Sequence, residues 1–572
     1  MPAADVRSCC AAVCRPDVLS GTRAFMGKRK KANPQPADNS SPLPPAGIRR
    51  HWAASEAAAG AGLALFLFTI YTATMLQGVD AGDSAELQFM SPLLGVCHPP
   101  GYAIEVCFGK LFSMLPFGPS AAWRINFMMV ISGTAGCLAL YGTIRRITGS
   151  IIAGVVGALT LGLSSIYWSF SVAAEVYVFY AMFLLWGLYC IVRFIDSKRS
   201  VWLYAAAAVL GICTADRISE ILIMPGFLLL WASVRKEVKL SILQLLAAAI
   251  VFILPFLFTV SFHLIQNHPQ KRTEALYGRD SALRFQILAD HFEVYIPPLL
   301  QRIKGAVQYC LGLMYKKDAK FNTSVMAWDM NKYVWLLSGM GAAGERFPSG
   351  DRRNSEQGTG TSIGILGLAA AAAGLIQHRK NWGWLLLGLW MFSANLIFIL
   401  WHHRWDNLTF TIPGLAGLAM LAGIGASGGQ EAGRKTVIYR YICLIIPLFL
   451  LVTNYPLVNR NTAAEKKNLE QLQKISKASF AANSAIITTY WPAMTYRYLI
   501  QLEGGREDIR IIHEETKNWQ KLVDYFLNKG LPVYMEKNRM NPDILQQAQK
   551  QTETDVWQAG FVKLPQLEPH RN

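Results

Sequence analysis

Long stretches without a charged side chain are the feature that most restricts how this chain can fold. Five of them contain no Asp, Glu, Lys or Arg, at residues 57–79, 125–144, 151–174, 240–262 and 381–401. An α-helix needs about 20 predominantly apolar residues to cross the hydrocarbon core of a bilayer. One buried helix of a soluble protein can show such a gap, but five in one chain of 572 residues indicate a membrane protein.

Hydropathy along the chain predicts about 11 transmembrane helices, and the two between residues 201 and 234 are short. The predicted spans are 57–78, 123–144, 151–170, 174–193, 201–216, 218–234, 240–263, 360–377, 382–401, 408–426 and 437–455. A further apolar stretch at 333–344 is shorter than a span. The expected fold class is therefore an α-helical polytopic membrane protein.

Basic side chains gather in alternate loops between these spans, which orients the chain in the membrane. They precede the first span and follow the second, fourth, sixth, eighth and tenth, as Arg49-Arg50, Arg145-Arg146, Lys198-Arg199, Arg235-Lys236, Arg379-Lys380 and Arg434-Lys435. The positive-inside rule makes this side cytoplasmic, and these loops account for the net charge of +18. No basic stripe with interleaved aromatic residues marks a soluble module, so nucleic acid is not an expected partner.

This topology divides the chain into three regions. Residues 1–50 are predicted to be a disordered cytoplasmic tail, because they are rich in Pro, Ala and Ser. The apolar core of a signal peptide is not expected among them. Residues 51–455 form the transmembrane domain, with a first external loop at 79–122. A long external segment at 264–359 contains amphipathic stretches that are expected on the membrane surface. Residues 456–572 predict a small extracytoplasmic α/β module, since helical and strand patterns alternate there.

Within this module, three strands and two helices are expected. The strands are predicted at 484–489, 508–512 and 532–535, and the helices at 461–479 and 519–527. No glycine-rich nucleotide fingerprint marks the module, so docking of an acceptor or a structural role is the simpler interpretation.

The ten cysteines of the chain show no metal-ligand spacing. Cys97 and Cys107 share the first external loop, where either a disulfide or two free thiols would fit.

Acidic side chains follow the first span directly, at Asp80, Asp83 and Glu86. Ionisable groups beside a membrane are costly unless they are hydrated, paired or used in function. If a helix begins near residue 83, Asp83 and Glu86 fall on one face, three residues apart. The alternative is a hydrated loop in which Asp83 and Ser84 cap that helix.

A His-Pro-Pro-Gly sequence follows at 98–101. Because proline fixes φ and glycine allows tight turns, this backbone is stiff and should hold His98 beside the acidic residues. Carboxylate oxygens and imidazole nitrogens bind divalent metals, so Asp80, Asp83, Glu86 and His98 make a metal site one option. No other cofactor is implied.

Two motifs therefore stand close together in this loop. They read Gly82-Asp83-Ser84-x-Glu86 and Leu94-Gly95-Val96-x-His98-Pro99-Pro100-Gly101-Tyr102. Their combination resembles an uncharacterised-domain family of multispanning, GT-C-type glycosyltransferases that includes the vertebrate transmembrane protein O-mannosyltransferases. Further matches are Leu115–Gly118, Trp123-Arg124-x-Asn126 and Ala174–Tyr177, whereas Ala85 replaces a glycine and Asp216-Arg217 replaces the expected Asn-His.

The resemblance implies sugar transfer from a polyprenyl-phosphate carrier to an acceptor hydroxyl on the outer face of the membrane. A carboxylate must accept the proton of that hydroxyl, and Asp83 is the expected base, with inversion at the sugar. Glu86 is expected to orient Asp83 or to bind the sugar. A phosphate leaving group needs no strong acid, so one carboxylate can suffice.

Several other side chains are candidates for substrate binding. His98 would position its loop or contact the donor, and Glu175 and Tyr177 would line the same cavity. Arg124 and Asn126 would either bind substrate or act as structural partners of Glu86 or Glu175. A cationic cluster would either stabilise the leaving phosphate or anchor the chain at the interface; it comprises His402, His403, Arg404 and Asp406.

The expected partners are a polyprenyl-phosphate-linked sugar, membrane lipid, and an acceptor that is a protein, a glycan or a lipid. A flippase for lipid-linked sugars and a non-catalytic membrane scaffold are the alternatives. Transporters usually contain internal repeats and charges near the bilayer midplane, whereas the ionisable residues here cluster at one face. Short loops and the lack of a eukaryotic targeting signal favour a bacterial inner membrane.

Overall fold

The computed structural model describes residues 48–80, 82–266, 299–313, 361–402, 407–428, 434–513, 519–539 and 542–564, with isolated positions between 326 and 338. Residues Ala54–Asn572 form one compact unit. The predicted tail lies almost entirely outside the described residues, as does most of the apolar stretch at 333–344.

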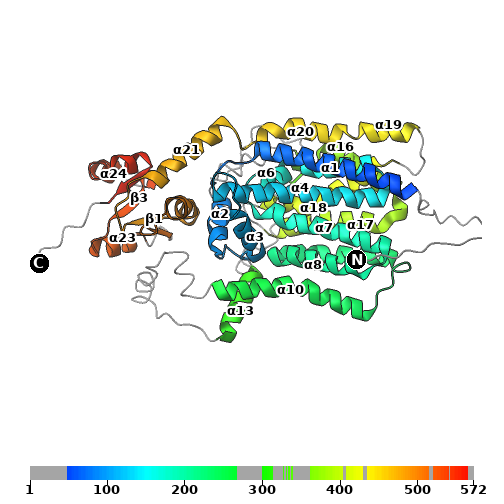
Figure 1. Cartoon of the computed structure of the whole chain (residues 1–572), viewed down its shortest axis with the longest axis horizontal. Helices are drawn as coiled ribbons and strands as arrows, with labels where there is room; N and C mark the ends of the chain where they lie inside the picture. Colours follow the sequence, from blue (N-terminus) through cyan, green and yellow to red (C-terminus); the bar gives the residue numbers. More distant parts are fainter. Residues whose placement is uncertain are drawn as a thin grey trace, which may run out of the picture. The chain divides into compact units, whose positions relative to one another are not determined.

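Helices dominate the described chain, and seven are long and apolar enough to cross a membrane (Figure 1). They are Ala54–Thr74 of α1 (Ile48–Thr74), α4 (Ala121–Thr148), α7 (Val176–Ser197), α10 (Ile242–Gln266), α17 (Trp382–Trp401), Thr409–Ala426 with α18 (Ile412–Ala426), and the run Arg434–Lys477 with α19 (Arg434–Ile442), α20 (Ile445–Val458) and α21 (Ala463–Lys477).

The remaining four predicted spans coincide with shorter or broken helices. Helices α5 (Ile151–Gly162) and α6 (Ser165–Ser171) meet at 73° and together make an eighth candidate span. The other three are α8 (Ser200–Asp216), η1 with α9 (Ile218–Ile223 and Met224–Val234), and α16 (Gly364–Gln377). The prediction of a helical polytopic membrane protein is thus confirmed, although length alone assigns seven or eight of the 11 expected spans.

Helix α18 forms the centre of the membrane bundle, and all of its residues are buried. Glycines allow its neighbours to approach closely, since a Cβ at Gly417 would lie 2.6 Å from the carbonyl oxygen of Gly388 on α17. Small residues at helix contacts are typical of membrane proteins, where close van der Waals packing drives association. Helix α10 is the opposite case, because its exposed Ile and Leu side chains suit contact with lipid.

Two short helices, α2 (Asp83–Leu93) and α3 (Ala103–Ser113), pack against each other and against α4 at one end of the long helices (Figure 1). Gly82, the N-cap residue of α2, has φ 71° and ψ −143°, a conformation that is nearly restricted to glycine. Between α10 and α16, the amphipathic helix α13 (Leu299–Cys310) packs on α10 through Ala306 and Cys310.

The C-terminal region contains a four-stranded sheet in the order β2-β1-β3-β4. Strands β1 (Ala485–Thr488), β2 (Arg510–His513) and β3 (Val533–Glu536) are parallel, and β4 (Phe561–Lys563) is antiparallel to β3. The other elements are α22 (Tyr490–Tyr496), η5 (Arg497–Glu503), α23 (Trp519–Asn528), η7 (Lys537–Arg539), α24 (Pro542–Gln549) and α25 (Thr554–Gln558).

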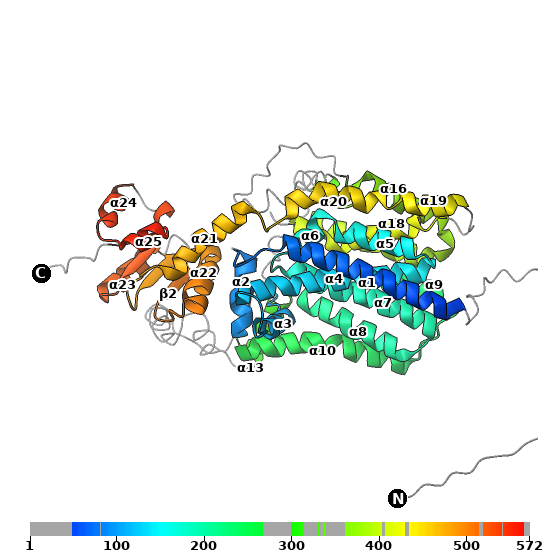
Figure 2. The same cartoon turned by 45° about the horizontal axis from the view of Figure 1, so that its top comes forward.

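This sheet agrees with the predicted α/β module. The three predicted strands and both predicted helices are present within a few residues of their expected bounds. Strand β4 was missed because three residues are too short to show an alternating pattern. Helix α22 follows β1 directly and packs against α2 (Figure 2).

Candidate active site

The acidic motif and the His-Pro-Pro-Gly motif meet at the start of α2. One ligand atom each of Asp83, Glu86 and His98 lies within 4.8 Å of the other two. Asp83 is the first residue of α2 and is partly exposed, whereas Glu86, one turn later, is only 1% exposed. The predicted proximity of the two motifs is therefore present in the structure.

Glu86 holds the loop that carries His98. Its Oε1 accepts a hydrogen bond from the backbone nitrogen of His98 at 2.7 Å, and its Oε2 lies 2.5 Å from His98 Nδ1. The hydroxyl of Tyr490 also donates to Oε1. Both carboxylate oxygens of Glu86 thus already accept hydrogen bonds. Glu86 is therefore better suited to hold other groups in position than to accept a proton from a substrate.

Ser84 joins the first turn of α2 to α7. Its hydroxyl donates to Oε1 of Glu175 at 3.0 Å, and Glu175 immediately precedes α7. The alternative of a side-chain cap by Asp83 and Ser84 is wrong, because the N-cap residue is Gly82 and no side chain caps this helix. The hydroxyl of Ser84 is turned to Glu175 instead.

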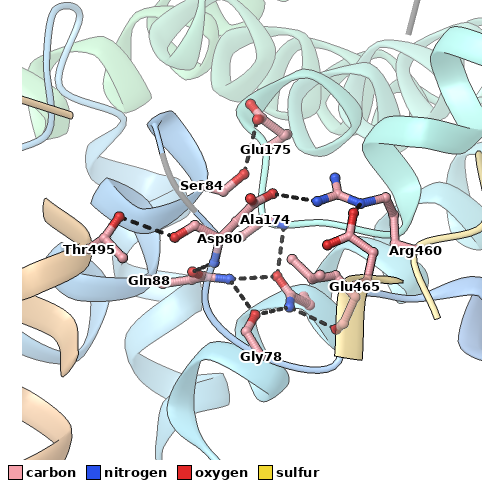
Figure 3. Close-up of polar contacts among 11 residues, drawn as sticks. Gly78, Asp80, Ser84, Gln88, Ala174, Glu175, Arg460, Glu465 and Thr495 are labelled. Atoms are coloured by element: carbon pink, nitrogen blue, oxygen red, sulfur yellow. Dashed lines mark hydrogen bonds and ion pairs between the residues drawn. The ribbon is translucent and has the colours of Figure 1, made fainter. Parts of the chain in front are cut away.

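Asp80 belongs to a polar network with Gln88, Thr495 and Arg460 (Figure 3). Its carboxylate forms an ion pair with Arg460 at 3.2 Å, and its backbone nitrogen donates to Gln88 Oε1 at 3.0 Å. The hydroxyl of Thr495 donates to its carbonyl oxygen at 3.2 Å. These contacts connect the loop after α1 to the C-terminal region and give Asp80 a structural role.

Asn126 holds the backbone of the segment that precedes α2. Its amide nitrogen donates to the carbonyl oxygens of Leu76 and Gly78, each at 2.9 Å, and its Oδ1 accepts from Gln88 and Ala174. Because Asn126 is fully buried, these bonds use its amide for structure and favour the structural alternative over substrate binding.

Arg124 also contacts backbone, and its role in substrate binding stays a prediction. Its Nη1 donates to the carbonyl oxygens of Phe117 and Gly118, at 3.3 and 3.4 Å. These bonds stabilise the turn before α4, and among the described residues no ion pair joins Arg124 to Glu86 or Glu175.

Tyr177 and His402 are brought together by an aromatic cluster around Phe410. The ring centroids of His402 and Phe410 are 5.5 Å apart, and those of Tyr177 and Phe410 are 6.3 Å apart. The guanidinium of Arg217 lies 3.9 Å from the centre of the Phe410 ring and 4.8 Å from that of Tyr177, distances at which a cation is attracted to a ring. His403, Arg404 and Asp406 lie outside the described residues.

Buried carboxylates between α3 and α8 were not predicted. Glu105 and Asp216 are at most 1% exposed. Burial, followed by the nearby carboxylates of Asp216 and Glu175, raises the pKa of Glu105 well above its usual value. In the sequence, Asp216-Arg217 differs from the Asn-His expected from the family, and this difference pointed to the cluster. The charge of Arg217 opposes the rise in the pKa of Glu105.

Tyr490 and Arg460 are further side chains that sequence reasoning did not assign to this region. Tyr490 follows a predicted strand, and no local pattern connects it to Glu86 some 404 positions earlier. Cys97 and Cys107 are free thiols, so the disulfide alternative is wrong. The Cys97 carbonyl oxygen instead accepts from the hydroxyl of Tyr309 on α13 at 2.5 Å.

Fold and site together define a multi-pass helical membrane protein with a carboxylate–histidine cluster at one end of its helices. Residues 83–241 match the family model described as the protein O-mannosyl-transferase TMEM260 N-terminal domain. This match agrees with the resemblance to the family that includes the vertebrate transmembrane protein O-mannosyltransferases, and the matched residues include Asp83, Glu86 and His98.

Two curated relatives carry the same description. The protein O-mannosyl-transferase TMEM260 of Mus musculus is 28% identical over 509 residues, which is 83% of this chain and 65% of the relative. Its Dictyostelium discoideum counterpart is 28% identical over 185 residues, which is 29% of this chain and 23% of the relative. The chain thus spans less than two thirds of the length of either relative.

Two solved structures are also similar. The oligosaccharyltransferase of Archaeoglobus fulgidus, tethered to an acceptor peptide, matches with a TM-score of 0.46 and 11% identity over 86% of this chain and 70% of that one. ArnT from Cupriavidus metallidurans, bound to undecaprenyl phosphate, matches with a TM-score of 0.47 and 10% identity over 90% of this chain and 98% of that one.

Proposed function

We propose that this chain is a membrane glycosyltransferase that moves a sugar from a polyprenyl-phosphate carrier to an acceptor hydroxyl. The main support is the contrast between two carboxylates of α2. Glu86 is buried with both oxygens engaged, whereas Asp83 is partly exposed at the first position of the helix. Asp83 is therefore the carboxylate that an incoming hydroxyl can reach.

In the proposed reaction, Asp83 accepts the proton of the acceptor hydroxyl as its oxygen attacks the anomeric carbon of the sugar. The bond from that carbon to the phosphate oxygen breaks, and the polyprenyl phosphate leaves with the bonding electrons. A single displacement of this kind inverts the anomeric configuration. The carrier phosphate needs no proton to depart, so one base is sufficient.

Glu175 and two basic side chains, Arg217 and His402, complete the proposed site. Glu175 is tied to the helix of the base through Ser84, and it is well placed to contact a sugar hydroxyl. Arg217 and His402 contact the same ring, Phe410, and are the proposed partners of the departing phosphate. Arg404 and His403 follow His402 in sequence and belong to the same proposal.

The relatives favour a particular donor and acceptor. Because both curated relatives are named protein O-mannosyl-transferases, we propose mannose as the sugar and a Ser or Thr hydroxyl of a protein as the acceptor. The cluster is proposed to face the extracytoplasmic side, opposite the basic loop at Arg145-Arg146. A bacterial inner membrane stays a prediction from loop length.

The test is transfer of radiolabelled mannose from polyprenyl phosphate to Ser- and Thr-containing peptides by the purified protein in nanodiscs. Asp83→Asn should lower kcat by about 100-fold or more, because a positioned base contributes that much, while donor binding persists. Asp196→Asn is the control, since Asp196 pairs with Arg146 at 3.2 Å at the far end of α7.

Transfer by Asp83→Asn at the wild-type rate would overturn the assignment of the base. Movement of a fluorescent lipid-linked sugar across vesicle membranes, with no transfer by either protein, would instead support the flippase alternative.

A further inference from the structure

Tyr490 lies where the C-terminal sheet meets the candidate active site. It begins α22 two residues after β1, the central parallel strand, so it lies at the carboxyl edge of the sheet. Open α/β sheets characteristically bind ligands at this edge. His513 ends the neighbouring strand β2, and its ring lies edge-on to that of Tyr490 with 5.1 Å between centroids. The tyrosine ring is thus fixed within its own module.

The hydroxyl of Tyr490 points out of this module and donates a hydrogen bond to Oε1 of Glu86. Burial, and then the Glu86 carboxylate, raise the pKa of Tyr490 well above 10, so the hydroxyl keeps its proton and can serve as a donor. Glu86 therefore has three donors, which are the Tyr490 hydroxyl and the backbone and ring nitrogens of His98. The donors come from both ends of the chain.

Other contacts dock the C-terminal module without Tyr490. The backbone nitrogen of Ala122, at the start of α4, donates to the hydroxyl of Tyr498 at 2.9 Å. Thr495 bonds to the carbonyl oxygen of Asp80, whose carboxylate pairs with Arg460. Loss of the Tyr490 hydroxyl alone should therefore leave the module in place.

We infer that Tyr490 is a positioning residue of the active site: its hydroxyl fixes the Glu86 carboxylate, and the C-terminal module thereby completes the site that α2 begins. Glu86 in turn holds His98 and shares the first turns of α2 with Asp83. Without the third donor, the carboxylate is held by His98 alone, and the geometry between Asp83 and His98 is less well defined.

The kinetic test rests on the proposed function and compares Tyr490→Phe with Tyr498→Phe. Both variants remove one hydroxyl from the interface between the module and the membrane helices. Tyr490→Phe should lower kcat for mannosyl transfer about tenfold, as expected for a lost hydrogen bond to a charged group, with KM for the donor unchanged. Tyr498→Phe should retain the wild-type kcat. Equal losses in the two variants would overturn the inference, as would full activity of Tyr490→Phe.

A second measurement does not depend on any transfer reaction. The protein is prepared with ¹⁵N-labelled histidine and studied by NMR. The Nδ1–H signal of His98 is assigned because it is absent from the spectrum of His98→Gln. Tyr490→Phe removes a donor that shares the Glu86 charge, so the bond from His98 should strengthen and this signal should move downfield. An unchanged signal overturns the inference. If the wild-type protein transfers no sugar but the signal moves, the proposed function fails and the positioning of Glu86 stands.

Discussion

Asp80 and Arg460 are 380 positions apart in the chain, yet their side chains form an ion pair at 3.2 Å. The two groups are only 10% and 16% exposed, and Arg460 also pairs with Glu465 at 2.8 Å. This pair fastens the loop after α1 to the segment that follows α20. It therefore fixes the approach of the C-terminal module to α2.

Loss of this ion pair should destabilise the protein. Arg460→Met leaves the carboxylate of Asp80 buried without its cation, which costs about 3 kcal/mol, and the melting temperature in detergent should fall. The double variant Asp80→Asn/Arg460→Met should recover part of that loss. Arg506→Met is the control, since its pair with Asp508 is one third exposed and contributes about 0.5 kcal/mol. Equal effects of the two single variants would contradict the prediction.

The backbone of Gly82 should be essential for the site. Its φ of 71° and ψ of −143° are strained for any residue with a side chain, at a cost of about 1–3 kcal/mol. Gly82→Ala should therefore lower the melting temperature and also slow transfer, because Asp83 is the next residue. Gly62→Ala in α1 is the control, because no other heavy atom lies within 4 Å of its added Cβ. A harmless Gly82→Ala would show that the turn can relax.

Glu105 should make stability depend on pH. Its pKa is raised in the folded protein, mainly by burial, so folding favours the neutral form. The contribution of Glu105 to the free energy of unfolding is fully present below about pH 4, near the pKa of an unfolded glutamate. It is lost as the pH rises through the pKa that Glu105 has in the folded protein. Glu105→Gln should thus be at least as stable as the wild type at pH 7, and the difference should shrink toward pH 4. Melting curves across this range check it, with the exposed Glu237→Gln as control.

Arg217 should be needed as a guanidinium and not only as a charge. Arg217→Lys keeps one positive charge among Phe410, Tyr177 and Tyr180 but loses the planar group that stacks on these rings. We expect the variant to fold, with transfer from the lipid-linked donor slowed about tenfold or more. A lysine variant with wild-type kcat and KM for the donor would exclude Arg217 as a partner of the phosphate.

Transfer should survive thorough chelation. Asp83, Glu86 and His98 are close enough to share a divalent ion, but Glu86 Oε2 and His98 Nδ1 face each other at 2.5 Å, which leaves those two atoms committed to their own contact. Activity after EDTA treatment and gel filtration is the measurement. Loss of transfer that Mn²⁺ or Mg²⁺ restores would show that an ion separates this pair in the working enzyme.

The sequence by itself determined the membrane helices and the core of the site. Charge-free gaps reflect the cost of polar groups in hydrocarbon, so all eleven predicted spans coincide with helices. Asp83 and Glu86 lie one turn apart on α2, and the stiff His-Pro-Pro-Gly backbone follows within the same loop, so local geometry brings His98 near them.

The tertiary structure decided which groups those residues contact. Tyr490 and Arg460 reach α2 from the C-terminal region, and no periodicity reports a contact across some 400 positions. Arg124 and Asn126 carry a recognisable motif, yet both donate to backbone carbonyl oxygens. For Asn126 the reason is burial, because a buried polar group must find hydrogen-bond partners within the protein. The roles of Glu86 and Asp83 likewise separate only once burial is known, since the sequence presents two similar carboxylates and the fold encloses one of them.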